Sequence, residues 1–210
     1  MGEVKGLIFD LDGVVVSTEQ NHFESWKGIA EVLGAEFNEA LNENLKGVSR
    51  ADSLRFILEN SKIEISDAEF EDLLIRKNDF YRKSISDLST ENILPGVIEV
   101  IEKAKAQGIK VMIGSSSRNA RFILDKLGII DEFDHIVDGN DVTFPKPHPE
   151  VFLNGAKLAN LDPANCIVFE DAASGVKAAK EGGFKAVAVG NPHIKDLADE
   201  YYETLKEFTL

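Results

Sequence analysis

The stretch Leu7-Ile8-Phe9-Asp10-Leu11-Asp12-Gly13 decides how the chain is organised. It belongs to an apolar run that begins at Val4, has the length of a buried strand and ends on two aspartates. Because a buried strand offers a carboxylate no water, Asp10 and Asp12 are expected just past its end, where ligands bind in open α/β sheets. Gly13 allows a sharp turn there. The stretch predicts a functional strand end, although a simple acidic turn is the alternative.

The composition is typical of a globular protein without a membrane segment. The chain has 210 residues, of which 43% are hydrophobic, enough for one core and a small second unit. No apolar run reaches the length of a membrane span. The chain enters its first strand too early for a signal peptide, and its single cysteine, Cys166, excludes an internal disulfide. These features predict a cytoplasmic protein with Cys166 as a small core residue.

The charge of the chain limits its partners. The formal net charge is −14 at pH 7. Such an acidic surface repels nucleic acid and anionic lipid, so neither is an expected partner. An anionic substrate would need a local group of cations to bind.

A helical segment follows the first strand. From residue 18 to about residue 87 the periodicity is helical, and no strand is expected. Gly34 ends the first helix, Asn38 and Ser49 cap the next two, and the run Ser66-Asp67-Ala68-Glu69 forms a capping box for the fourth. Four helices without a strand predict a small helical unit inserted behind the first strand.

From Pro95 onward, strands and helices alternate. Strands are expected at residues 110–114, 135–137, 167–169 and 185–189, with a short last strand at 201–203. Alternation of this kind is typical of a doubly wound parallel sheet, and the first strand belongs with it. The sequence therefore predicts an α/β fold with a discontinuous core domain, residues 1–16 and 89–210, and an inserted helical cap domain, residues 17–88.

Polar residues follow two further strands and one loop of this core. Ser115 to Asn119 supply hydroxyls, a cation and an amide, which favour an anion site, with an ordinary serine cap as the alternative. Pro145 and Pro147 flank Lys146 and predict a stiff, extended loop that restricts where its ammonium points. A surface lysine in a turn is the alternative there.

The strand at 167–169 ends on paired acids, Glu170 and Asp171, as the first strand does. If the two strands are neighbours, this concentration of charge requires a cation, and oxygen ligands favour Mg²⁺. Two unrelated acidic turns are the alternative. Carboxylates, a metal, hydroxyls and a fixed lysine together predict phosphoryl transfer, with one aspartate as nucleophile and another as general acid/base.

Four ordered motifs carry a resemblance over nearly the whole chain. Asp10-Leu11-Asp12-Gly13-Val14, Ser115, Lys146-Pro147 and Glu170-Asp171 resemble the motifs of the haloacid dehalogenase superfamily of phosphotransferases. Within it, the chain is most similar to the β-phosphoglucomutase family, on Thr18, His22, Trp26 and residues 45–50, 76–78 and 115–119. The resemblance implies interconversion of β-D-glucose 1-phosphate and D-glucose 6-phosphate through an aspartyl-phosphate and β-glucose 1,6-bisphosphate.

The resemblance also implies a role for each matching residue. Asp10 is expected to be the nucleophile and Asp12 the general acid/base. The expected catalytic set is Asp10, Asp12, Thr18, His22, Lys46, Ser115 and Lys146. The expected substrate-binding set is Asp12, Trp26, Gly47, Val48, Arg50, Lys77, Ser117, Arg118 and Asn119. Mg²⁺ is expected on Asp10, the backbone of Asp12, Glu170 and Asp171.

Some of these residues also have simpler interpretations. Trp26 has the spacing of a buried helix face, and Arg50 and Lys77 alone would be solvated cations. Two positions depart from the family: Ser17 replaces a usual aspartate, and Arg118 replaces a lysine of different reach. We expect a monomer that acts on a small phosphorylated sugar.

Two other classes of function are the alternatives. A hydrolase of the same superfamily, a sugar-phosphate phosphatase or pyrophosphatase, is the main alternative because water would replace the second substrate. A non-enzymatic binding protein is disfavoured by the intact acids and Lys146.

Overall fold

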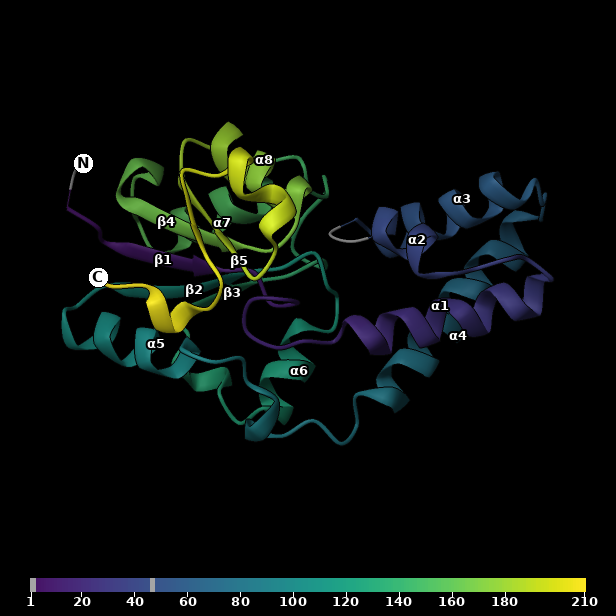
Figure 1. Cartoon of the computed structure of the whole chain (residues 1–210), viewed down its shortest axis with the longest axis horizontal. Coiled ribbons are helices and arrows are strands. Elements are labelled where there is room, and N and C mark those ends of the chain that lie inside the picture. The colour runs from purple at the N-terminus through teal and green to yellow at the C-terminus, as the bar shows by residue number, and fades with distance from the viewer. Residues whose placement is uncertain (1–2, 46–47) are drawn as a thin grey trace. The chain divides into compact units, whose positions relative to one another are not determined.

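The computed structural model describes residues 3–45 and 48–210, and it divides into two compact units (Figure 1). The core unit is formed by Met1–Ser17 and Leu88–Leu210, and the helical unit by Thr18–Asp87. The boundaries predicted from the sequence differ from these by one residue at each junction. We propose that the two units are separate domains.

A six-stranded parallel sheet, in the order β3-β2-β1-β4-β5-β6, lies at the centre of the core unit. The strands are β1 (Gly6–Phe9), β2 (Lys110–Gly114), β3 (His135–Val137), β4 (Cys166–Glu170), β5 (Lys185–Val189) and β6 (Glu200–Tyr202). The predicted parallel sheet is confirmed. The predicted boundaries are correct for β2, β3 and β5, whereas β1 begins two residues later and β4 extends to include Glu170.

Helices cover both faces of this sheet. α5 (Val97–Ala106) and α6 (Ala120–Lys126) lie on one face, and α7 (Glu150–Leu158) and α8 (Ala173–Glu181) lie on the other (Figure 1). α6 begins at Ala120, after the segment Ser115 to Asn119. The cause is local, because the Oγ atoms of Ser115 and Ser117 accept hydrogen bonds from the amides of Ser117 and Asn119 and hold this backbone out of the helix.

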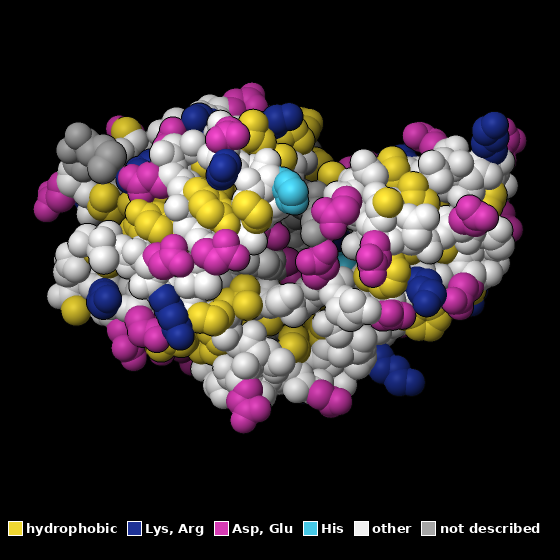
Figure 2. Space-filling view, viewed as in Figure 1, with side chains coloured by type: hydrophobic (Ala, Val, Ile, Leu, Met, Phe, Trp, Pro, Cys, Tyr) yellow, Lys and Arg dark blue, Asp and Glu magenta, His cyan; other side chains and the backbone are white. Residues whose placement is uncertain are grey.

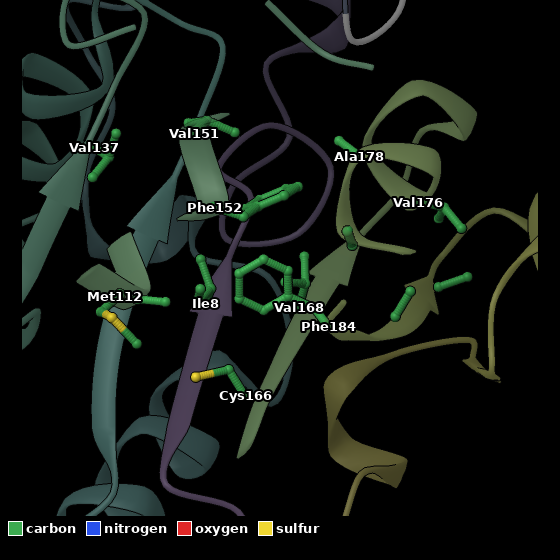
Figure 3. Close-up of a cluster of buried hydrophobic side chains, with 14 of the residues drawn as sticks. Ile8, Met112, Val137, Val151, Phe152, Cys166, Val168, Val176, Ala178 and Phe184 are labelled. Carbon is green, nitrogen blue, oxygen red and sulfur yellow. The ribbon is translucent and has the colours of Figure 1, made fainter. Parts of the chain in front are cut away.

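Buried side chains fix β1 in the middle of the sheet. Ile8, Met112 and Val168 point to one face and pack with Phe152 of α7 (Figure 3). Cys166 belongs to the same cluster, as expected for a small core residue. In the strand register, Phe9 lies opposite Ile113 and Phe169, so the residues that follow β1, β2 and β4 meet at one edge of the sheet.

The helical unit contains α1 (Glu19–Leu33), α2 (Glu39–Asn42), α3 (Arg50–Ser61) and α4 (Asp67–Ser84). The predicted end signals are confirmed: Gly34 is left-handed with φ 67°, the side chains of Asn38 and Ser49 cap their helices, and Ser66 and Glu69 form the capping box. The helices bury one shared apolar cluster: Trp26, Ile29, Leu45, Leu54, Ile57, Leu58 and Leu73.

The surface reflects the composition. Acidic side chains are spread over both units on the face shown in Figure 2. Every helix within residues 3–45 and 48–210 is too short or too polar to cross a membrane.

Candidate active site

Lys146 lies at the centre of the polar edge of the sheet. Its Nζ donates hydrogen bonds to Asp10 Oδ1 at 2.6 Å and to Glu170 Oε1 at 2.5 Å. The lysine is only 4% exposed, so the alternative of a surface lysine is wrong. The expectation of an extended loop is also wrong, because the His148 amide donates to the Pro145 carbonyl and closes a turn. The turn brings the ammonium inward to the two acids.

The charges of this centre oppose one another in a dry environment. Burial raises the pKa of Asp10 to about 7; Lys146 acts to lower it, and the charges of Glu170 and Asp12 act to raise it. Burial acts to lower the pKa of Lys146, but Asp10 and Glu170 outweigh it and raise the pKa above its ordinary value. Lys146 is therefore a permanent cation, which offsets part of the acidic charge.

Asp171 completes the acidic cluster. Burial, followed by the charges of Glu170 and Asp10, raises the pKa of Asp171 well above its ordinary value. Asp10, Glu170 and Asp171 each offer a carboxylate oxygen, and these oxygens lie within 4.8 Å of one another. Glu170 belongs to β4 itself rather than following it; the Lys146 ammonium and the Ala172 amide, 3.0 Å from Glu170 Oε2, compensate for its burial.

The donor set fits a hard divalent cation. Three carboxylates converge although burial disfavours the charged forms of Asp10 and Asp171, and oxygen-only ligation is what Mg²⁺ prefers. Two glycines leave room for the ligands: a Cβ on Gly13, where φ is 84°, would collide with Asp171 Oδ2, and one on Gly175 would collide with Glu170 Oε1. Asp12 is half-buried and lies beyond β1 beside this cluster. Its carboxylate is outside the group of three.

The segment after β2 carries the predicted anion-binding residues. Ser115 is 1% exposed, and its amide donates to the Val137 carbonyl. Arg118 is exposed, and Asn119 is buried at 8% exposure. The backbone amides of Ser117 and Asn119 donate to serine oxygens at 3.1 and 3.3 Å. The side chains of this segment are the better candidates for binding.

Five residues of the helical unit form one cluster. Thr18, His22, Trp26 and Lys77 were predicted site residues, and Tyr81 was not. Lys77 Nζ lies 2.9 Å from His22 Nδ1 and 4.9 Å from the centre of the Trp26 ring. The Tyr81 hydroxyl donates to Thr18 Oγ1 at 3.1 Å, and its ring lies 4.1 Å from the His22 ring. Lys77 and Trp26 are each 3% exposed, so the alternative of a solvated Lys77 is wrong and that of a buried Trp26 is correct.

This cluster keeps His22 neutral. Burial lowers the pKa of His22 well below its ordinary value, and the charges of Lys77 and Arg50 lower it further. Neutral His22 can accept a hydrogen bond from Lys77 Nζ at its Nδ1 atom and donate a hydrogen bond from its Nε2 atom. Arg50 also donates to the Leu74 carbonyl at 3.5 Å, and Val48 packs on the apolar cluster of the helical unit. The predicted residues Lys46 and Gly47 lie outside the described residues.

Two residues of these sites were not predicted. No role was predicted for Tyr81, yet its hydroxyl donates a hydrogen bond to Thr18 Oγ1; its position four residues after Lys77 is the signal that the sequence carries. Asn191 donates from Nδ2 to the Asp171 carbonyl at 2.8 Å and so supports the acidic cluster. No sequence motif marks Asn191.

The chain is similar to known proteins of one family. A family model of haloacid dehalogenase-like hydrolases matches residues 4–183. The β-phosphoglucomutase of Bacillus subtilis is 43% identical over 189 residues, covering 89% of this chain and 84% of that protein. The phosphorylated carbohydrates phosphatase of Thermotoga maritima is 34% identical, covering 88% of this chain and 84% of that protein.

A solved structure also resembles this chain in its fold. The crystal structure of β-phosphoglucomutase from Clostridium difficile superposes with a TM-score of 0.94 at 36% identity, covering 99% of this chain and 94% of that one. The likeness confirms the predicted fold, a doubly wound core with an inserted helical cap, and the resemblance carried by the four motifs. The chain belongs to the haloacid dehalogenase-like hydrolase family.

Proposed function

We propose that the protein is an enzyme that interconverts β-D-glucose 1-phosphate and D-glucose 6-phosphate in the cytoplasm, acting as a monomer. The buried Lys146, held between Asp10 and Glu170, is the observation that carries the proposal. It fixes a positive charge beside these carboxylates, where a negatively charged phosphoryl group would bind. The similarity to the β-phosphoglucomutases of B. subtilis and C. difficile supports this choice of substrate.

Asp10 is proposed as the nucleophile that carries the phosphoryl group. The phosphoryl group on Asp10 passes to the C6 hydroxyl of β-glucose 1-phosphate, while Asp12 takes the hydroxyl proton. The bound 1,6-bisphosphate then returns its C1 phosphoryl group to Asp10, and Asp12 protonates the departing C1 oxygen. Glucose 6-phosphate leaves, and the aspartyl-phosphate is regenerated. Ser115 and Lys146 bind the oxygens of the phosphoryl group in transfer.

Mg²⁺ is proposed as the cofactor, on Asp10, the Asp12 backbone, Glu170 and Asp171. The convergence of three carboxylates and the room left by Gly13 and Gly175 support this choice. When bound, Mg²⁺ supplies positive charge that offsets the negative charge of the phosphoryl group and the acids.

A mutase needs a second anion site, since its sugar carries a phosphate at either end. We assign this phosphate to Arg50 of the helical unit and to Ser117, Arg118 and Asn119 of the core unit. The arginine fork matches phosphate oxygens, and Arg118 retains the charge of the family's lysine. Gly47 and Val48 are assigned to the sugar, and Thr18, His22 and Lys46 to orienting Asp12; Trp26 and Lys77 are buried in the helical unit and are assigned no contact with the sugar.

A phosphatase of sugar phosphates is the second candidate. The T. maritima relative, named a phosphorylated carbohydrates phosphatase, favours it, and the core residues would serve water as the acceptor equally well. Two products distinguish the candidates. Glucose 6-phosphate and free phosphate should be followed in parallel from β-glucose 1-phosphate with Mg²⁺, with and without the 1,6-bisphosphate. Faster formation of glucose 6-phosphate is expected; faster release of phosphate would establish the phosphatase instead.

A further inference from the structure

The segment after β3 is bonded along its length to the segment that follows β2. The Ser115 amide donates to the Val137 carbonyl at 3.0 Å, and the Gly139 amide donates to the Ser117 carbonyl at 3.3 Å. The Asn140 side chain continues this contact, because its Nδ2 donates to the Arg118 carbonyl at 3.1 Å. Three successive hydrogen bonds therefore fix the backbone from which Ser117, Arg118 and Asn119 project.

A buried carboxylate sets the direction of the Asn140 amide. Asp138 is 1% exposed, and its Oδ1 accepts from the Asn140 backbone amide at 2.8 Å and from Asn140 Nδ2 at 2.9 Å. One amide group thus donates to Asp138 and to Arg118. An asparagine held from both sides is oriented rather than free to rotate, although it lies at the surface.

Arg121 balances the buried charge. Asp138 Oδ2 accepts no hydrogen bond within residues 3–45 and 48–210, and Arg121 Nε lies 3.4 Å from it. The same guanidinium donates to the Ile136 carbonyl at 2.7 Å and to Asp141 Oδ2 at 3.2 Å, and Asp141 Oδ2 accepts from the Asp138 amide. The network joins α6 to the end of β3 and makes the Asp138 orientation rigid.

Gly139 lets the two segments approach closely. A Cβ at this position would collide with the Ser116 carbonyl and lie 3.0 Å from Arg118 Cγ. The backbone of the 138–141 segment is thus in contact with the backbone of the proposed phosphate-binding segment, and no side chain fits between them.

We propose that Asn140, oriented by Asp138, is a positioning residue that sets the affinity of the Ser117–Arg118–Asn119 segment for the non-reacting phosphate of the sugar. The inference rests on the proposed function, which assigns that phosphate to this segment. Asn140 acts through the Arg118 carbonyl and touches neither the substrate nor Asp10. Its effect falls on substrate affinity and leaves the chemistry at Asp10 unchanged.

The test compares Asn140→Ala with Asn154→Ala. Asn154 of α7 donates to the Asp141 carbonyl at 3.5 Å, so its variant removes an amide that contacts the same loop without touching the Arg118 backbone. Steady-state kinetics should be measured on β-glucose 1-phosphate and on acetyl phosphate, which has no second phosphate. Asn140→Ala should raise the KM for the sugar phosphate about three- to tenfold, with kcat and acetyl phosphate kinetics unchanged.

Gly139→Ala should raise the same KM further, because its Cβ displaces the Ser116 carbonyl. Asn154→Ala should match the wild type. An unchanged KM in Asn140→Ala, or an equal loss on both substrates, would overturn the inference. If the wild type hydrolyses sugar phosphates without forming glucose 6-phosphate, the proposed function fails. The KM for that hydrolysis then gives the same comparison of variants and still decides the role of Asn140.

Discussion

The acidic cluster should make the stability of the metal-free protein fall as pH rises. Burial, partly offset by Lys146, raises the pKa of Asp10 from 3.8 to about 7. Between these values the folded protein retains a proton that the unfolded chain has released, so raising the pH favours unfolding. The shift corresponds to about 4 kcal/mol at full effect, of which about 3 kcal/mol develops between pH 5 and pH 8. Asp171 shifts in the same direction.

The measurement is thermal unfolding in excess chelator from pH 5 to pH 8, with and without added Mg²⁺. The Asp10 contribution of about 3 kcal/mol corresponds to about 6–12 °C in Tm for a chain of this size, and it is taken from the difference between the wild type and Asp10→Asn, because protonation of His22 opposes it below about pH 6.5. Mg²⁺ binds the deprotonated acids of the folded state, so its stabilisation should be small at pH 5 and large at pH 8.

Two matched variants isolate the effect of Asp10. Asp10→Asn cannot titrate, so its metal-free Tm should exceed that of the wild type at pH 8 and fall less steeply with pH. Asp131→Asn, an exposed aspartate of the same unit, should follow the wild type. The lowered pKa of His22 costs stability below about pH 6.5, but equally in all three proteins, so the difference between variants is unaffected. A wild-type curve as flat as that of Asp10→Asn would refute the reasoning.

Three further outcomes are expected. Asp10→Asn should abolish turnover and prevent labelling of the intact protein by acetyl phosphate, as followed by mass spectrometry; retained turnover would contradict the nucleophile assignment. Arg50→Ala should slow glucose 6-phosphate formation roughly 30- to 4,000-fold, the effect of losing a charged contact of about 2–5 kcal/mol, and should spare acetyl phosphate hydrolysis; equal losses in the two assays would argue against its phosphate role. Gly175→Ala should weaken Mg²⁺ binding about 10- to 100-fold in titration calorimetry, because its Cβ displaces Glu170. Gly155→Ala, which has room for a Cβ, should bind Mg²⁺ as the wild type does; equal affinities of the two variants would contradict a role of Gly175 in placing Glu170.

The acidic half of the site could be predicted because it depends on strand ends. A buried strand has to end before its carboxylates, and parallel strands bring their ends to one edge. Asp10 and Asp171 follow these two rules, whereas Glu170 departs from the first because it lies within β4, where Lys146 and the Ala172 amide compensate for its burial. The order of the strands did not follow, because alternation of strands and helices does not say which strands are neighbours.

Contacts between distant residues could not be predicted. The pairing of Lys146 with two acids depends on a turn, whereas the prolines on either side of Lys146 predicted an extended loop. Tyr81 meets Thr18 across 63 positions of sequence. Asn140 is an exposed asparagine outside any motif, and only the pairing of β2 with β3 brings it to Arg118. Each depends on tertiary packing, which local patterns do not encode.

The position of β1 has a consequence for the newly synthesised chain. β1 leaves the ribosome before its two neighbours, which begin at Lys110 and Cys166. At ordinary rates of translation, this apolar strand waits about 5–20 s before β2 exists and longer before β4 does. The helical unit, whose contacts are local, can fold during that interval. A strand that is fully buried in the finished protein therefore remains unpaired until β2 and β4 have been synthesised.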